Sequence, residues 1–130
     1  MRDFLSDQQS IIDDTFERTV KIVVGQRAKS GKALTLDNGP TAYPTILLSY
    51  RGEPSDSLVL AHEFGHALQI RASRGKFVPP IIREVCAFLG EGALLCHTLQ
   101  RNAAEYTHFA QVWREHNYKY FGTQRDRLQA

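Results

Sequence analysis

The chain has 130 residues, which suits one domain spanning residues 1–130 with a single core. Sixteen basic and fourteen acidic residues give a net charge of +2, and the basic residues are spread in ones and twos, which argues against nucleic acid as a partner. The N-terminus carries acids where a signal peptide needs a basic segment, and no apolar run approaches the roughly 18 residues of a membrane span. We therefore expect a cytoplasmic protein that does not enter a membrane.

The first part of the chain predicts a helix and then a β-hairpin. From Ser6 to Val24, apolar residues recur at three- and four-residue steps, which is typical of a helix, and residues 25–32 read as a loop. The runs KALTLD and TILLSYRG flank Asn38-Gly39 and predict a hairpin with a longer connection. Pro44 favours an edge strand for the second run, because proline donates no backbone hydrogen bond. Such an edge is either simply exposed or pairs with an extended peptide.

The second part of the chain predicts three helices, at about 54–73, 81–99 and 103–120. Pro54 begins the first of them, and Pro80 stands where the second begins. The second helix is apolar nearly all round, as expected of a central buried helix, and Gly122 is a candidate cap for the third. The expected fold class is α+β and mainly α.

The stretch LAHEFGHALQ in the first of these helices carries an HExxH motif. On a helix, His62 and His66 share one face and can bind one tetrahedral Zn²⁺, while Glu63, offset by roughly 100°, can face a water at the metal and act as general base. The motif by itself is equally compatible with a solvated helix face.

Glu84 is the natural third ligand, because a carboxylate within an apolar helix is rare unless it is paired or bound to metal. The alternative for Glu84 is a salt bridge near the helix start. Glu91, seven residues later, presents its carboxylate on the same face two turns on. We expect it to accept the free ring N–H of His62 or His66, with a buried pair to an arginine as the alternative.

These residues resemble the catalytic core of the thimet oligopeptidase and oligoendopeptidase F family of zinc peptidases, which are gluzincins. The resemblance rests on Pro44 to Tyr50 with Gly52, on the stretch from Leu60 to Leu68, and on Glu84 and Glu91 in PPIIREVCAFLGE. It covers residues 43–95 well and continues weakly through WREHNYKYFG.

The resemblance implies a zincin-like core in which a small antiparallel sheet packs on the HExxH helix, beside a buried helix that bears Glu84. It implies one Zn²⁺ per chain on His62, His66 and Glu84, with Glu63 as general base. The implied activity is hydrolysis of peptide bonds in short or extended peptides. The strand implied to pair with the peptide substrate comprises Ile46, Leu47, Leu48, Ser49, Tyr50 and Arg51.

The sequence also departs from the family. Its members are several times longer and use a histidine and tyrosines on a glycine-rich loop near the C-terminus to stabilise the oxyanion, and this chain ends before such a loop. Gln69 stands where many members have a third histidine. Tyr118 and Tyr120 are the first candidates to replace the oxyanion groups, and weak activity is expected without them. Two alternatives to an enzyme remain: a degenerate zinc-containing peptide-binding domain, or an interaction domain that zinc supports. A homodimer is compatible with the pattern.

Overall fold

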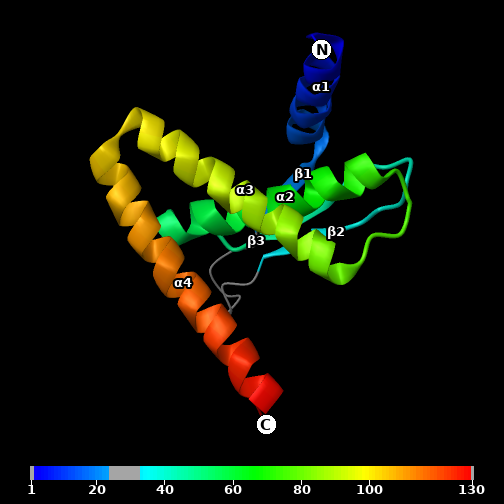
Figure 1. Ribbon diagram of the computed structural model, residues 1–130. Coiled ribbons are helices and arrows are strands. Elements are labelled where there is room, and N and C mark those ends of the chain that lie inside the picture. The colour runs from blue at the N-terminus through cyan, green and yellow to red at the C-terminus, as the bar shows by residue number, and fades with distance from the viewer. Residues whose placement is uncertain (1, 24–32, 130) are drawn as a thin grey trace.

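A computed structural model describes residues 2–23 and 33–129, apart from the side chains of 2–7, 120, 123–124 and 127–128. The loop predicted at residues 25–32 lies outside the described residues. Four helices and a three-stranded sheet make up the described fold (Figure 1), which confirms the α+β, mainly α class. The elements are α1 (Arg2–Arg18), β1 (Val20–Val23), β2 (Leu34–Leu36), β3 (Thr45–Leu48), α2 (Pro54–Ser73), α3 (Pro80–Arg101) and α4 (Ala103–Gln129).

The sheet has the order β1-β3-β2, so β3 is its central strand. The predicted hairpin is confirmed, because β2 pairs antiparallel with β3, but β1 pairs parallel with β3 on the other side. The prediction that β3 is an edge strand is therefore wrong. Pro44 lies one residue before β3 and uses only its carbonyl, which accepts the N–H of Val20 at 3.3 Å. With both neighbours in place, Ile46, Leu47 and Leu48 have no free edge to offer a peptide, as had been predicted for them.

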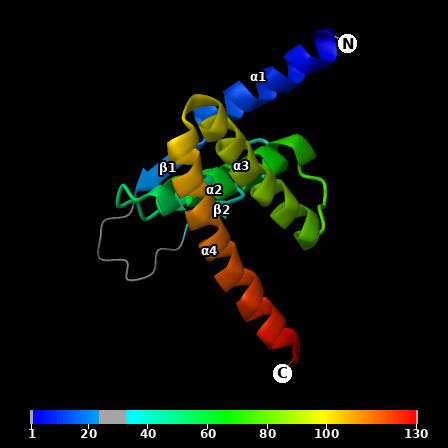
Figure 2. The ribbon, with the colours of Figure 1, turned by 60° about the vertical axis from the view of Figure 1, so that its left-hand side comes forward.

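The first helix begins within the predicted region but ends earlier than predicted. Helix α1 stops at Arg18, and the apolar residues from Val20 to Val23 form β1 instead of a last helical turn. This run, VKIV, is rich in the β-branched residues that strands favour, and its parallel pairing with Thr45 to Leu48 decides the outcome. Helix α1 extends away from the rest of the molecule, as both ribbon views show (Figures 1 and 2).

Helix α2 is the middle layer, with the sheet on one side and α3 on the other. The Asp56 carboxylate accepts the backbone N–H groups of Arg51 at 2.7 Å and of Glu53 at 3.0 Å, which fixes the start of the helix. The side facing the sheet forms a small core of Ile46, Leu48 and Ala67, against which Phe64 packs. The HExxH helix is therefore held along its length, from its first turn to its contact with the sheet.

Two glycines let the backbones of α2 and α3 approach closely. A Cβ atom added to Gly65 would lie 2.4 Å from the carbonyl oxygen of Cys86, and one added to Gly90 would lie 2.3 Å from that of Ala61. Real Cβ atoms do not approach so closely, so the crossing requires glycine at both positions. Glu84 and Glu91 lie on α3 before and after the region that contacts Gly65, which places one carboxylate on each side of the crossing.

The prediction that the apolar α3 is buried all round is wrong. Its buried residues are Ala87, Glu91 and Thr98, whereas an outer face remains exposed at Ile82 (46%), Val85 (49%), Leu89 (67%) and Leu99 (50%). The glycine contacts with α2 use only one face of the helix. The opposite face is therefore an apolar surface.

Helix α4 does not end at Gly122 as predicted but continues to Gln129. One glycine costs only about 1 kcal/mol inside a helix, which flanking turns offset. The first half of α4 crosses α2 and α3, and the second half extends away from them (Figures 1 and 2). Within the described residues, no helix is long and apolar enough to cross a membrane.

Candidate metal centre

The structure brings the three predicted ligands together. Nε2 of His62 lies 3.6 Å from one Glu84 carboxylate oxygen, and Nε2 of His66 lies 3.6 Å from the other. One ligand atom from each residue lies within 4.8 Å of the other two. These distances are too long for hydrogen bonds. They match ligands of one tetrahedral zinc ion, which lie about 3.4 Å apart when each bond is about 2.0 to 2.2 Å.

The two helices supply the ligands for reasons visible in the sequence. His62 and His66 lie one turn apart on α2, with ring centroids 5.0 Å apart. Glu84 lies in the second turn of α3 and is 42% exposed at the side chain, so its place near a metal does not come from burial. Burial was the reason given for Glu84 from the sequence, and it applies instead to Glu91, which is 3% exposed.

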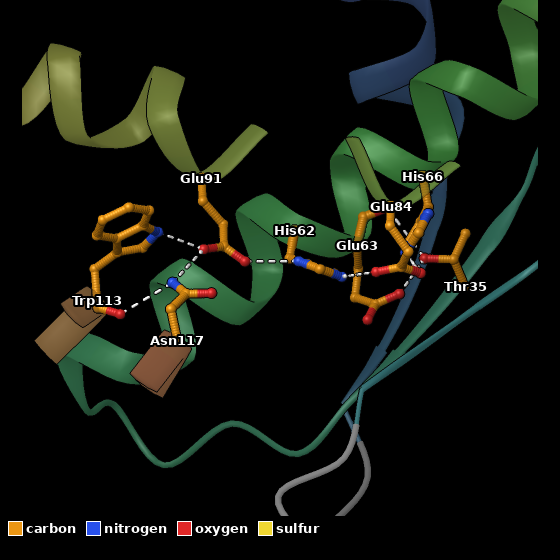
Figure 3. Close-up of polar contacts among 8 residues, drawn as sticks. All are labelled: Thr35, His62, Glu63, His66, Glu84, Glu91, Trp113 and Asn117. Atoms are coloured by element: carbon orange, nitrogen blue, oxygen red, sulfur yellow. Dashed lines mark hydrogen bonds and ion pairs between the residues drawn. The ribbon is translucent and has the colours of Figure 1, made fainter. Parts of the chain in front are cut away.

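Glu91 accepts a hydrogen bond from His62, as predicted. Its Oε1 lies 2.6 Å from Nδ1 of His62. Its Oε2 accepts from the indole N–H of Trp113 at 2.6 Å and lies 3.4 Å from the amide nitrogen of Asn117 (Figure 3). The alternative of a buried arginine pair is not what the structure shows. With Nδ1 engaged in this way, His62 presents Nε2 to the metal position.

Glu63 points toward the sheet and is buried, with 8% of its surface exposed. The hydroxyl of Thr35, on β2, lies 2.5 Å from its Oε2 and 3.0 Å from its backbone carbonyl (Figure 3). A hydroxyl donating to one carboxylate oxygen leaves the other oxygen to act as a base. Glu63 is therefore held in a fixed direction beside the two histidines.

The two imidazoles have opposite pKa shifts. Burial lowers the pKa of His62, but the hydrogen bond and the negative charge of Glu91 together outweigh it, so the pKa of His62 is raised. Burial, with the positive charge of His62, lowers the pKa of His66. A metal ion needs both rings deprotonated, so metal binding here releases any proton that His62 carries.

Two hollows meet at His62 and Glu63. One, the metal cleft, has a volume of about 550 Å³ and contains Thr35, His62, Glu63, His66 and Glu84, with Lys76 and Arg83 in its wall. The other, the aromatic pocket, has a volume of about 390 Å³. Its walls are Ala33, Leu58, Val59, His62, Glu63, Phe88, Glu91, Trp113, His116 and Asn117.

The remaining predicted residues lie elsewhere. Ser49, Tyr50 and Arg51 follow β3 and line neither hollow. Tyr118 is 78% exposed and lines surface hollows along α4 that contain none of the metal ligands, and the side chain of Tyr120 is outside the description. Thr35, Trp113 and Asn117 were not predicted. Trp113 carried the one available signal, since a partly buried indole needs an acceptor for its N–H.

Comparison with known proteins adds no relative: no protein-family model, curated protein or solved structure matches the chain. The resemblance to the thimet oligopeptidase and oligoendopeptidase F family stays a prediction that rests on the motifs alone. Function must therefore be argued from the site.

Proposed function

We propose that the chain is a zinc-dependent metallopeptidase that hydrolyses peptide bonds in short or extended peptides. One observation carries the proposal: the ligand atoms of His62, His66 and Glu84 converge next to the buried carboxylate of Glu63, in a cleft large enough for a peptide. A purely structural zinc site usually has four protein ligands, whereas three ligands leave a position for the reaction.

The donor set fits zinc best. Two imidazole nitrogens and one carboxylate suit Zn²⁺, while magnesium and calcium prefer oxygen ligands alone. The 3.6 Å separations between each histidine nitrogen and a Glu84 oxygen fit the spacing around a tetrahedral ion. One zinc ion per chain follows from one such cluster among the described residues.

The mechanism assigns a separate task to each side chain. When bound, zinc supplies Lewis acidity, which polarises a peptide carbonyl and lowers the pKa of water. Glu63 takes the proton of the attacking water and returns it to the departing amine. Thr35 holds the Glu63 carboxylate in place, and Glu91 holds the His62 ring. The products are a carboxylate and an amine, and the bond broken is the peptide C–N bond.

The free edge of β2 is the best place for an extended peptide. In the described part of the sheet, β2 has β3 on one side only, and its residues Leu34 and Thr35 line the metal cleft. A peptide can form backbone hydrogen bonds with such an edge. The peptide-pairing role predicted for β3 thus passes to β2 in this proposal.

The second candidate is a zinc-containing peptide-binding or interaction domain without turnover. It is favoured by the absence of a tyrosine from the described walls of the metal cleft and the aromatic pocket. Loss of one oxyanion donor typically lowers the rate by about 10² to 10³. The two candidates share the metal and the cleft and differ only in chemistry.

The test compares wild type with Glu63→Gln. We expect both proteins to bind one zinc ion, and we expect the variant to lose about 10² to 10⁴ of the hydrolysis rate on a mixed peptide library, because it lacks the general base. Glu105→Gln, on the exposed side of α4, is the matched control and keeps the wild-type rate. A chelator abolishes wild-type hydrolysis and added zinc restores it.

The outcomes separate the candidates. Zinc binding and peptide binding without wild-type hydrolysis favour the binding domain. Hydrolysis that survives Glu63→Gln contradicts the role of Glu63. A wild-type protein that takes up no zinc contradicts both candidates.

A further inference from the structure

We propose that the aromatic pocket binds an aromatic side chain of the peptide, next to the bond that is cleaved, with tyrosine preferred. This inference rests on the proposed function for its position in the reaction, although the pocket itself can be tested without metal. It names the substrate class that the site selects.

The walls of the pocket are suited to an aromatic ring. Leu58, Val59, Phe88 and Trp113 give it an apolar lining from three helices. A volume of about 390 Å³ lies within the range of small-ligand sites, and apolar walls with few polar groups are typical of them. Aromatic rings in such walls favour edge-to-face or offset contact with another ring.

The pocket also contains a buried hydrogen-bond acceptor without a partner. Asn117 is 6% exposed, and its amide nitrogen donates to the carbonyl of Trp113 at 3.0 Å and lies 3.4 Å from Glu91. Because both of these neighbours are acceptors, they fix which end of the amide is the nitrogen. The amide oxygen points away from the Trp113 carbonyl and has no partner among the described residues (Figure 3). A buried acceptor left unpaired is costly, so a ligand that brings a donor is favoured.

The position of the pocket connects it to the reaction. It shares Ala33, His62 and Glu63 with the metal cleft. A peptide that lies in the cleft with one side chain in the pocket therefore has a backbone amide group beside Glu63. The phenol of tyrosine combines an apolar ring with an O–H donor, and phenylalanine lacks that donor.

The chain contains a single tryptophan, Trp113, so its fluorescence reports on this pocket alone. Metal-free protein is titrated with N-acetyltyrosinamide, N-acetylphenylalaninamide and N-acetylalaninamide, with excitation beyond the tyrosine absorption band. We expect saturable changes in emission with the two aromatic probes and none with the alanine probe. We expect the tyrosine probe to bind about fivefold tighter than the phenylalanine probe, as one hydrogen bond would give.

Val59→Phe fills the pocket and is expected to abolish binding of both aromatic probes. Leu60→Phe is the control, because Leu60 packs against the same core from α2 but does not line the pocket. Circular dichroism checks that both variants fold. If Val59→Phe does not fold, Val59→Ala serves, with binding about threefold weaker than wild type because apolar contact is lost.

Three results would overturn the inference: equal binding of the three probes, equal binding of the tyrosine and phenylalanine probes, or binding that Val59 substitutions leave unchanged. The zinc-loaded protein then receives peptides that differ only in a tyrosine or an alanine at one position. Cleavage beside tyrosine is expected to be faster, and equal cleavage of the two peptides contradicts the role of the pocket in the reaction. Probe binding without zinc-dependent hydrolysis leaves the pocket in place and contradicts the proposed function.

Discussion

His62 uses both of its ring nitrogens. Nδ1 is bound to Glu91, and Nε2 lies 3.6 Å from a Glu84 oxygen at the metal position. A carboxylate that accepts the Nδ1 proton fixes the tautomer and increases the basicity of the ring toward a metal. Trp113 and Asn117 in turn contact the second oxygen of Glu91. One side chain of the last helix therefore helps to determine the direction in which a metal ligand points.

Glu91→Gln should weaken zinc binding by about 10-fold to 100-fold, because the neutral amide is a poorer acceptor for His62 and brings an N–H group into a position that Trp113 already supplies with a donor. Zinc affinity is measured by competition with a chelator of known affinity. Glu115→Gln, an exposed position on α4, is the control and should bind zinc as wild type does. Wild-type zinc affinity in Glu91→Gln would show that this hydrogen bond does not support the metal site.

At the residue scale, the sequence predicted the site where the spacing lies within one helix. His62, Glu63 and His66 follow from the period of α2, and Glu84 and Glu91 from the period of α3. Thr35 and Asn117 could not be predicted, because each reaches the site from an element whose placement depends on the whole fold. No local pattern distinguishes Thr35 from the other threonines of the chain.

Helices α2 and α3 meet through a glycine contact. Gly65 lies inside the HExxH motif, and Gly90 lies one residue before Glu91. The glycines bring the two backbones close enough for a carboxylate on α3 to reach a histidine on α2. The contact between these two elements is therefore a requirement of the metal site.

Gly90→Ala should push α3 away from α2 and weaken zinc binding, since the new methyl group would meet the carbonyl oxygen of Ala61. Gly92→Ala is the matched control, because it lies on the same helix and a Cβ there meets nothing within 4 Å. The control should bind zinc normally and raise the free energy of unfolding by about 0.5 to 1 kcal/mol. Thermal unfolding and zinc titration of both variants check the prediction, and equal behaviour of the two would refute it.

At the element scale, the limits of the prediction have physical causes. The starts of α2 and α3 were predicted because proline at the first helical turn is a local signal. Strand β1 was missed because its partner lies 25 residues further along the chain, and the spacing of Val20 and Val23 also fits a helix. The exposure of α3 was missed because its sequence is apolar on both faces, and only packing determines which face is covered.

The molecule as a whole exposes a large surface for its mass. Its accessible area is 9650 Å². A compact monomer of this mass exposes about 6,900 Å², so the excess is about 2,700 Å², more than the roughly 1,600 Å² that a standard interface buries. Part of the exposed surface is the outer face of α3. Its residues recur at alternating steps of three and four: Ile82, Val85, Leu89, Gly92, Cys96 and Leu99.

We predict that this face pairs with the same face of a second copy, since alternating three- and four-residue steps form a helix–helix seam and a twofold dimer needs only one self-complementary surface. Light scattering after gel filtration should give the mass of a dimer for wild type and of a monomer for Leu89→Lys. Tyr118→Lys, which replaces an exposed residue on α4, should remain a dimer. A monomeric wild type at high protein concentration would disprove the pairing.

The close contact between Gly65 and α3 has a mechanical consequence. It acts as the fulcrum of a lever whose two arms carry Glu84 and Glu91. Any rocking of α3 about that point moves the two carboxylates in opposite directions, so Glu84 cannot approach the histidines without a change in the grip of Glu91 on His62. Forces on the outer face of α3, including those from a second copy, would thus be transmitted to both sides of the metal position at once.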